Sequence, residues 1–254
     1  MSARGLRNAI YPLAGLALIV LAWQLYVTAF GVNRIVLPSP LDIARASVAN
    51  WQTLLRETWP TFWESVLGFG LAVAIGIPVA VCVASSRILN LSLYPILIAT
   101  QSVPKVAVAP IILVWFGLGM QSKLVIAFLV AFFPIVVDTA AGMRATPPGL
   151  LELARSLRAS RLQVFLKVQF PAALPFVFAG AKVAVTLAVI GAVIGEFVGS
   201  LSGLGNLLLM ANSQLDSALA WAALIWLSAL GIVLFGAVVL VERLVMPWAT
   251  VGHH

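Results

Sequence analysis

Charged residues are scarce in this sequence. Only 9% of its 254 residues are Asp, Glu, Lys or Arg, whereas 62% are hydrophobic. Because soluble domains carry roughly a quarter charged residues, this composition excludes an ordinary soluble protein and indicates an integral membrane protein. The net charge is nonetheless +7. In a membrane protein such an excess is typical of basic cytoplasmic loops, and nucleic acid is not an expected partner.

Cysteine and histidine are almost absent. The single cysteine, Cys82, lies in an apolar run and has no second cysteine with which to form a disulfide or a metal site. His253 and His254, the two histidines, close the chain and resemble a tag remnant. A zinc or haem site is therefore not expected. A membrane-embedded enzyme, which needs clustered His, Asp or Cys near its spans, is disfavoured for the same reason.

Long apolar runs fill most of the chain. About 20 apolar residues cross a bilayer core, and runs of that length lie at about residues 10–30, 61–84, 91–117, 123–143, 176–197 and 219–240. The third run contains Pro95, Pro104 and Pro110. Because proline removes a backbone donor, this span is expected to be bent or discontinuous. The predicted fold is all-α, with six membrane spans in a single transmembrane domain.

Two segments between the spans have a character of their own. Residues 200–217 predict a Gly-rich loop followed by a short apolar helix. Residues 31–60 predict an amphipathic helix that lies in the membrane interface. Its apolar face would carry Leu41, Ala44, Val48, Trp51 and Leu55.

Cationic residues are unevenly distributed between the loops. Six spans place both termini on one side, where the loops carry Arg4, Arg7, Arg87, Arg144, Arg155, Arg158, Arg161, Lys167 and Arg243. The opposite side carries only Arg34, Arg45, Arg56 and Lys123. By the positive-inside rule both termini are cytoplasmic, residues 31–60 are periplasmic, and residues 144–175 form a cytoplasmic loop.

The cytoplasmic loop carries a spaced motif. Its residues are Glu152, Leu153 and Ala154, then Arg158 after three residues, then Val168, Gln169, Phe170 and Pro171 after nine more. This spacing resembles the EAA loop of permease subunits of bacterial binding-protein-dependent ABC importers, whose pattern is E-A-A, three residues, G, nine residues, I-x-L-P. The segments 104–119 (PKVAVAPIILVWFGLG) and 194–205 (IGEFVGSLSGLG) resemble the nitrate, sulfonate and taurine branch of that family.

The resemblance implies a type I ABC importer permease fold in the bacterial inner membrane. It implies a homodimer that binds two ABC ATPase subunits and a periplasmic substrate-binding protein, and that works by alternating access without covalent chemistry. The chain has no Walker G-x-x-x-x-G-K-[ST] run, so it is not expected to be an enzyme. ATP and Mg are expected on the partner ATPase, and no cofactor on this chain. The solute is expected to be small and anionic or organic, like nitrate, a sulfonate or taurine.

The predicted contact with the ATPase lies within residues 152–161. It comprises Glu152, Leu153, Ala154, Leu157, Arg158, Ala159, Ser160 and Arg161. A short helix over residues 152–160 would match Glu152 and the following arginines to the helix dipole. Arg158 stands where the family motif has Gly, which adopts a left-handed turn more easily. The segment is therefore expected either to stay right-handed, merging two helices into one, or to be strained.

Ionisable residues inside membrane spans are costly and often functional. Lys105 and Glu196 are expected to approach each other or to line the translocation pathway, together with Gln101 and Ser102. Lys105 would suit an anionic solute, or it would neutralise Glu196. Near their span ends, Glu64 and Lys182 are expected to snorkel toward water. Asp138 is a candidate partner for Lys182.

The fifth span carries a stripe of small residues. Gly191, Gly195 and Gly199 recur at every fourth position, which permits close approach of another helix. The stripe fits either a subunit interface or packing within one chain. The alternative function is an ion-coupled secondary transporter. That class shows inverted repeats with paired broken helices, whereas a single span is broken here.

Overall fold

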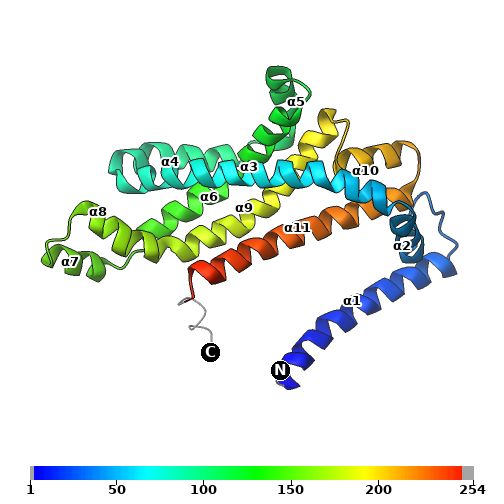
Figure 1. Ribbon diagram of the computed structural model, residues 1–254, viewed down its shortest axis with the longest axis horizontal. Helices are drawn as coiled ribbons and strands as arrows, with labels where there is room; N and C mark the ends of the chain where they lie inside the picture. Colours follow the sequence, from blue (N-terminus) through cyan, green and yellow to red (C-terminus); the bar gives the residue numbers. More distant parts are fainter. Residues whose placement is uncertain (1–2, 248–254) are drawn as a thin grey trace.

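The computed structural model describes residues 3–247 of the chain (Figure 1). Over these residues the chain is helical and contains no strand, which confirms the all-α prediction. The elements are α1 (Ala3–Ala29), α2 (Pro40–Ala49), α3 (Trp51–Ser85), α4 (Arg87–Gln101), α5 (Lys105–Phe116), α6 (Met120–Arg144), α7 (Pro148–Ser156), α8 (Arg161–Val164), the π-helix η1 (Phe165–Gln169), α9 (Phe170–Gly199), α10 (Leu204–Ser213) and α11 (Ser217–Val245).

Helices α3, α6 and α9 pack together at the centre of the molecule, and α11 runs alongside α9 (Figure 1). Small and branched apolar side chains fill the space between them, among them Ala131, Ile135, Ala184 and Ala188, all buried. Small side chains let helix backbones approach closely, and in a bilayer such packing takes over the role that the hydrophobic effect has in water. The three central helices therefore form the rigid part of the fold.

The glycine stripe of α9 packs against α6 of the same chain. A Cβ at Gly191 would lie 2.7 Å from the Cα of Ala127, and one at Gly195 would lie 3.0 Å from Cγ of Lys123. Gly199 closes the same face, against the side chain of Leu118. Of the two interpretations of the stripe, packing within one chain is the one that these contacts favour.

Within residues 3–247, four helices are long and apolar enough to cross a membrane: α3, the continuous helix Arg161–Gly199, α6 and α11. The pair α4 and α5 makes a fifth if it is taken as one span, bent by 95°. Pro104 stands at the break, directly before α5, so the predicted discontinuity of the third span is confirmed. The first predicted span, residues 10–30, falls on α1. The six-span topology and the side of the two termini stay predictions.

The interfacial helix is shorter than the prediction over residues 31–60. Helix α2 covers only Pro40–Ala49, and α3 begins directly after Asn50, well before the predicted start at residue 61. Pro60 lies inside α3 rather than at its start. Membrane helices tolerate an internal proline because neighbouring groups satisfy the freed carbonyl, so α3 continues through Pro60.

Helix α2 is capped by a reciprocal pair of hydrogen bonds. The N–H of Asp42 donates to the Ser39 hydroxyl (3.1 Å), and that hydroxyl donates to the Asp42 carboxylate (2.8 Å). The second bond holds the pKa of Asp42 below its ordinary value. Ile43 is buried toward the bundle, whereas the predicted apolar face of α2, including Val48, is exposed. That exposure fits a helix whose apolar face lies in lipid.

Candidate functional site

Helix α7 ends in a left-handed turn at Arg158, whose φ is +52°. The N–H of Ala159 donates to the carbonyl of Ala154 (3.0 Å), and the N–H of Arg158 donates to that of Arg155 (2.9 Å). These two bonds form a Schellman motif, which normally has Gly at the left-handed position. The prediction of one helix over 152–160 is therefore wrong. Arg158 adopts the strained conformation, and two bonds that satisfy helix-end carbonyls offset its cost of about 1 kcal/mol.

Helix α8 begins at a capping box. The Gln163 N–H donates to the Ser160 hydroxyl, and the Ser160 N–H donates to the Gln163 side chain at 2.8 Å. The chain then stays helical through η1 and α9 as far as Gly199. In η1 the Phe170 N–H reaches the carbonyl of Phe165, five residues back. This wider turn directly precedes Pro171, whose ring would crowd a tighter one.

The turn between α7 and α8 presents apolar side chains to the outside. Leu153 is 58% exposed and Leu157 is 74% exposed, while Ala154 faces inward and is buried. Exposed cations and one carboxylate surround them: Glu152, Arg155, Arg158 and Arg161. Exposed apolar side chains that lie together are typical of protein contact surfaces. We call residues 148–164, which form α7, the turn and α8, the α7–α8 unit. Its exposed leucines and arginines are suited to an apolar groove that has an acidic rim.

A cavity of about 820 Å³ separates the α7–α8 unit from the bundle. Its loop side carries Arg155 and Arg161, and its bundle side carries apolar side chains such as Val81 and Met143. The α7–α8 unit is thus joined to the bundle through its continuous helix more than through side-chain packing.

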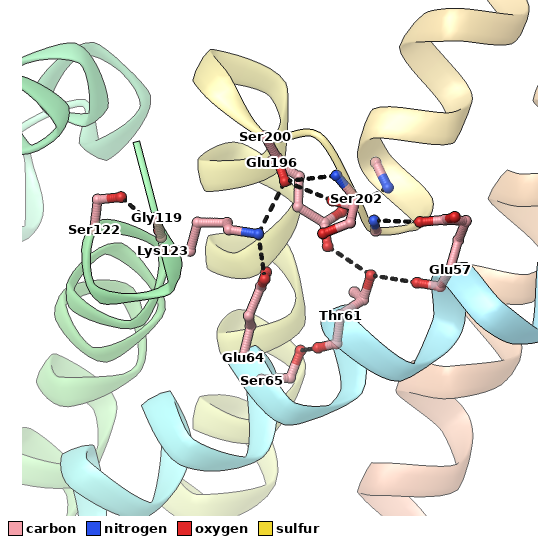
Figure 2. Close-up of polar contacts among 12 residues, drawn as sticks. Glu57, Thr61, Glu64, Ser65, Gly119, Ser122, Lys123, Glu196, Ser200 and Ser202 are labelled. Atoms are coloured by element: carbon pink, nitrogen blue, oxygen red, sulfur yellow. Dashed lines mark hydrogen bonds and ion pairs between the residues drawn. The ribbon is translucent and has the colours of Figure 1, made fainter. Parts of the chain in front are cut away.

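The opposite end of the bundle holds a second group of polar residues (Figure 2). There α3, α6 and α9 meet the loop before α10, and Figure 2 shows their side chains pointing toward one another. We call this group the α10-end cluster. It consists of Glu57, Thr61, Glu64, Lys123, Glu196, Ser200 and Ser202.

One half of the α10-end cluster is a buried ion pair. The Lys123 ammonium pairs with Glu64 and donates to the Ser200 hydroxyl at 2.9 Å. The side chains of Lys123 and Glu64 are only 9% and 2% exposed. The prediction that Glu64 snorkels toward water is therefore wrong. Its carboxylate turns inward because Lys123, on the neighbouring helix, compensates its charge.

The other half of the α10-end cluster holds the N-terminus of α10. Glu196 accepts a hydrogen bond from the Thr61 hydroxyl (2.6 Å) at one oxygen and from the Gly205 N–H (2.6 Å) at the other. Thr61 in turn accepts from the N–H of Leu204 at 2.9 Å. The carboxylate of Glu196 on α9 thus connects α3 with the first turn of α10, and Glu196 is only 1% exposed.

Gly203 is required by this arrangement. Its φ is +106°, and a Cβ there would lie 1.9 Å from a carboxylate oxygen of Glu196. Its N–H donates to Glu57 at 2.8 Å. No side chain fits between these two carboxylates. Within the segment 194–205, Gly203 and Gly205 are therefore explained by the close packing of this part of the backbone on the Glu196 carboxylate.

Comparison with known proteins decides the family. Residues 72–247 match the family described as binding-protein-dependent transport system inner membrane component. The chain belongs to this family. It is the permease subunit of an ABC importer, as the spacing of the EAA-like loop predicted.

The relatives of the permease carry different solute names. It is 37% identical over 254 residues to RibX of Chloroflexus aurantiacus, a riboflavin transport system permease protein, with 96% of this chain and 94% of RibX covered. ThiX of Halalkalibacterium halodurans, a formylaminopyrimidine transport permease protein, is 31% identical, with 95% and 96% covered. Other relatives are named for nitrate import and bicarbonate transport.

A solved structure shares the fold of the permease. A chain of the methionine ABC transporter MetNI in an inward-facing form superposes with a TM-score of 0.68. The two chains are 24% identical, and the match covers 78% of the permease and 98% of the MetNI chain. This likeness shows the ABC importer permease fold.

Lys105 and Glu196 lie at different depths in the permease. The Lys105 ammonium lies 5.6 Å from the centroid of the Phe133 ring. Along α6, Phe133 is about ten residues, and so about 15 Å, from Lys123, which belongs to the α10-end cluster. The two oxygens of Glu196 are held within that cluster. The expected approach of Lys105 to Glu196 is therefore not formed.

The rest of the predicted pathway lies around the break between α4 and α5. Ser102 is exposed there, and the side chain of Gln101 lies outside the described residues. A pocket of about 200 Å³ is lined by Lys105, Phe133 and apolar neighbours. Their part in translocation stays a prediction.

Lys182 has a different partner from the one expected. Its ammonium lies 3.0 Å from each carboxylate oxygen of Glu242 on α11. Asp138 lies instead against Gly180, where an added Cβ would come within 2.9 Å of the Asp138 Cβ. The expected pairing of Asp138 with Lys182 is wrong, because α11 presents Glu242 at the same depth.

Thr61, Lys123 and Ser200 were not predicted as site residues from the sequence. Lys123 was expected only as a charge in an outer loop. One signal was present: Glu64, Lys123 and Glu196 all stand near the same ends of their spans. Such charges at one depth on packed helices are candidates for pairing.

Proposed function

We propose that this permease works as a homodimer with two ATPase subunits in a bacterial inner membrane. A periplasmic binding protein delivers a small anionic or organic solute, and alternating access moves it across. ATP and Mg bind to the ATPase, and this chain contributes no catalytic group. In this arrangement the α7–α8 unit is cytoplasmic and the α10-end cluster is periplasmic, as the distribution of cations favours.

One observation carries the proposal. The α7–α8 unit leaves Leu153 and Leu157 exposed at the end of a hydrogen-bonded helix, and its second helix continues without interruption into a membrane span. An exposed apolar pair on a rigid support is what a docking element needs. A loop that only connected two spans would not be stabilised by leaving Leu153 and Leu157 exposed.

The test is copurification of the ATPase with the permease. Leu153→Glu with Leu157→Glu places charge in the docking groove, so we expect loss of the ATPase from the complex and loss of ATP-driven uptake. Val36→Glu is the matched control, because Val36 is 75% exposed and lies at the other end of the molecule. Retention of the ATPase by the double variant would refute the docking role. Vanadate-insensitive uptake driven by a sodium gradient would instead favour a secondary transporter.

A further inference from the structure

The cavity between the α7–α8 unit and the bundle is cationic. Its lining includes Arg155 and Arg161 but no Asp or Glu. Both arginines are exposed, and neither side chain makes an ion pair or a hydrogen bond with another described residue. Two cations that line one cavity repel each other, and an anion between them relieves that repulsion. The lining therefore attracts an anion.

Neutral polar groups add further donors to the same lining. Ser85 and Gln169 line the cavity, and the side chain of neither makes a hydrogen bond within the part of the chain that the structure describes. Gln169 is half-buried at the end of η1, and side chains that leave water are normally paired. Guanidinium, amide and hydroxyl groups all donate to phosphate oxygens, and an Arg fork can bind two of them at once.

The cavity lies beside the ends of three long helices. Ser85 is the last residue of α3, Met143 lies in the last turn of α6, and Gln169 directly precedes α9 (Figure 1). The ends of membrane spans lie at the depth of the lipid headgroups. Apolar side chains, among them Val81 and Phe165, complete the lining. Cations beside apolar walls at this depth match a molecule with a charged head and an apolar tail.

The size of the cavity agrees with a headgroup. Its volume is about 820 Å³, and sites for small molecules commonly measure about 300–1,000 Å³. Basic pockets between membrane helices are known to bind the headgroups of anionic lipids. Leu153, Leu157 and Arg158 do not line the cavity. A lipid in it therefore leaves these three residues available to the ATPase.

We propose that this cavity binds the phosphate headgroup of an anionic phospholipid. Arg155 and Arg161 bind the phosphate, and Ser85 and Gln169 supply further donors. The headgroup then connects the α7–α8 unit with the end of α3, across a gap that side chains do not fill. The inference goes beyond the proposed function, because it concerns the lipid around the permease and not the solute.

The test is native mass spectrometry of the full-length chain released from nanodiscs of phosphatidylcholine and phosphatidylglycerol in varied proportion. Both lipids carry a phosphate, but only phosphatidylglycerol has a net negative charge. We expect phosphatidylglycerol to be retained preferentially. Arg155→Gln with Arg161→Gln should weaken its retention about tenfold or more, since each cation near an anionic headgroup contributes about fivefold in affinity. Because both arginines are exposed, circular dichroism should show an unchanged fold.

A charge-matched control separates the cavity from the general surface charge. Lys167→Gln with Arg243→Gln removes two exposed cations that are predicted to lie on the same side of the membrane and do not line the cavity. Its retention of phosphatidylglycerol should stay close to that of the unmodified chain. Gln169→Leu changes no charge and should weaken retention about threefold or more, because a donor to a charged group is lost.

Three results would overturn the inference. The first is equal retention of the two lipids by the unmodified chain. The second is an equal loss in the two double variants, which would assign the effect to diffuse surface charge. The third is displacement of phosphatidylglycerol by inorganic phosphate beyond that by sodium chloride at the same ionic strength, which would assign the site to a soluble anion. The measurement uses neither ATPase nor solute, so its outcome is independent of the proposed function.

Discussion

Removing the Lys123 ammonium should destabilise the permease strongly. Lys123→Met keeps the length of the side chain but leaves the carboxylate of Glu64, which is 2% exposed, without its counter-charge. Breaking a buried pair by removing one partner costs about 3–5 kcal/mol. The free energy of unfolding in mixed micelles, followed by circular dichroism during titration with SDS, should fall by that amount.

A double variant separates the pair from the packing. Lys123→Met with Glu64→Leu removes both charges, so its free energy of unfolding should exceed that of Lys123→Met alone by about 2 kcal/mol or more. The matched control is Arg56→Met. Arg56 pairs with Glu57 at 3.0 Å but is 77% exposed, so its loss should cost about 0–1 kcal/mol. The reasoning fails if Lys123→Met costs no more than Arg56→Met, or if the double variant costs the sum of the two singles.

Three further predictions concern local geometry. Arg158→Gly should raise the free energy of unfolding by about 1 kcal/mol, because it relieves the left-handed φ; a lower value in the same SDS titration would contradict this. Gly191→Leu should lower it by about 1–3 kcal/mol, because the new side chain meets the Ala127 backbone, and unchanged stability would argue against tight packing there. Ser39→Ala should cost about 1 kcal/mol through loss of the cap. It should also raise the pKa of Asp42, measured by NMR titration. The depressed pKa contributes stability above the ordinary carboxylate pKa that is lost as the pH falls, so Ser39→Ala should flatten this acid-side loss.

The sequence predicted the features that depend on local pattern. Apolar runs predicted the membrane helices, and Pro104 predicted the break between α4 and α5. The motif spacing after Glu152 predicted the family and the position of the α7–α8 unit. Each of these features depends on residues that are close together in the sequence. Hydrophobicity, proline chemistry and motif spacing are therefore enough to predict them.

The contacts of the charged residues were not predictable in the same way. Glu196 and Thr61 are 135 residues apart and meet only because α3 and α9 pack against one another. From the sequence, Lys123 is expected to be a surface charge at the end of a span. It is buried because α6 is oriented about its axis with this side chain toward α3. Hydropathy gives the depth of a residue but not the side of the helix that faces a neighbour. For that reason the expected approach of Lys105 to Glu196 is not formed.

The uninterrupted helix from Arg161 to Gly199 connects the two sites mechanically. Its 39 residues span about 58 Å, with the α7–α8 turn at one end and the Glu196 cluster at the other. If a helix of this length tilted as a rigid body by about 5° around its midpoint, each end would be displaced by about 2.5 Å, in opposite directions. That displacement nearly equals the 2.6 Å length of the hydrogen bonds that Glu196 accepts from Thr61 and Gly205. A tilt of that size would therefore be enough to break or remake the contacts of Glu196.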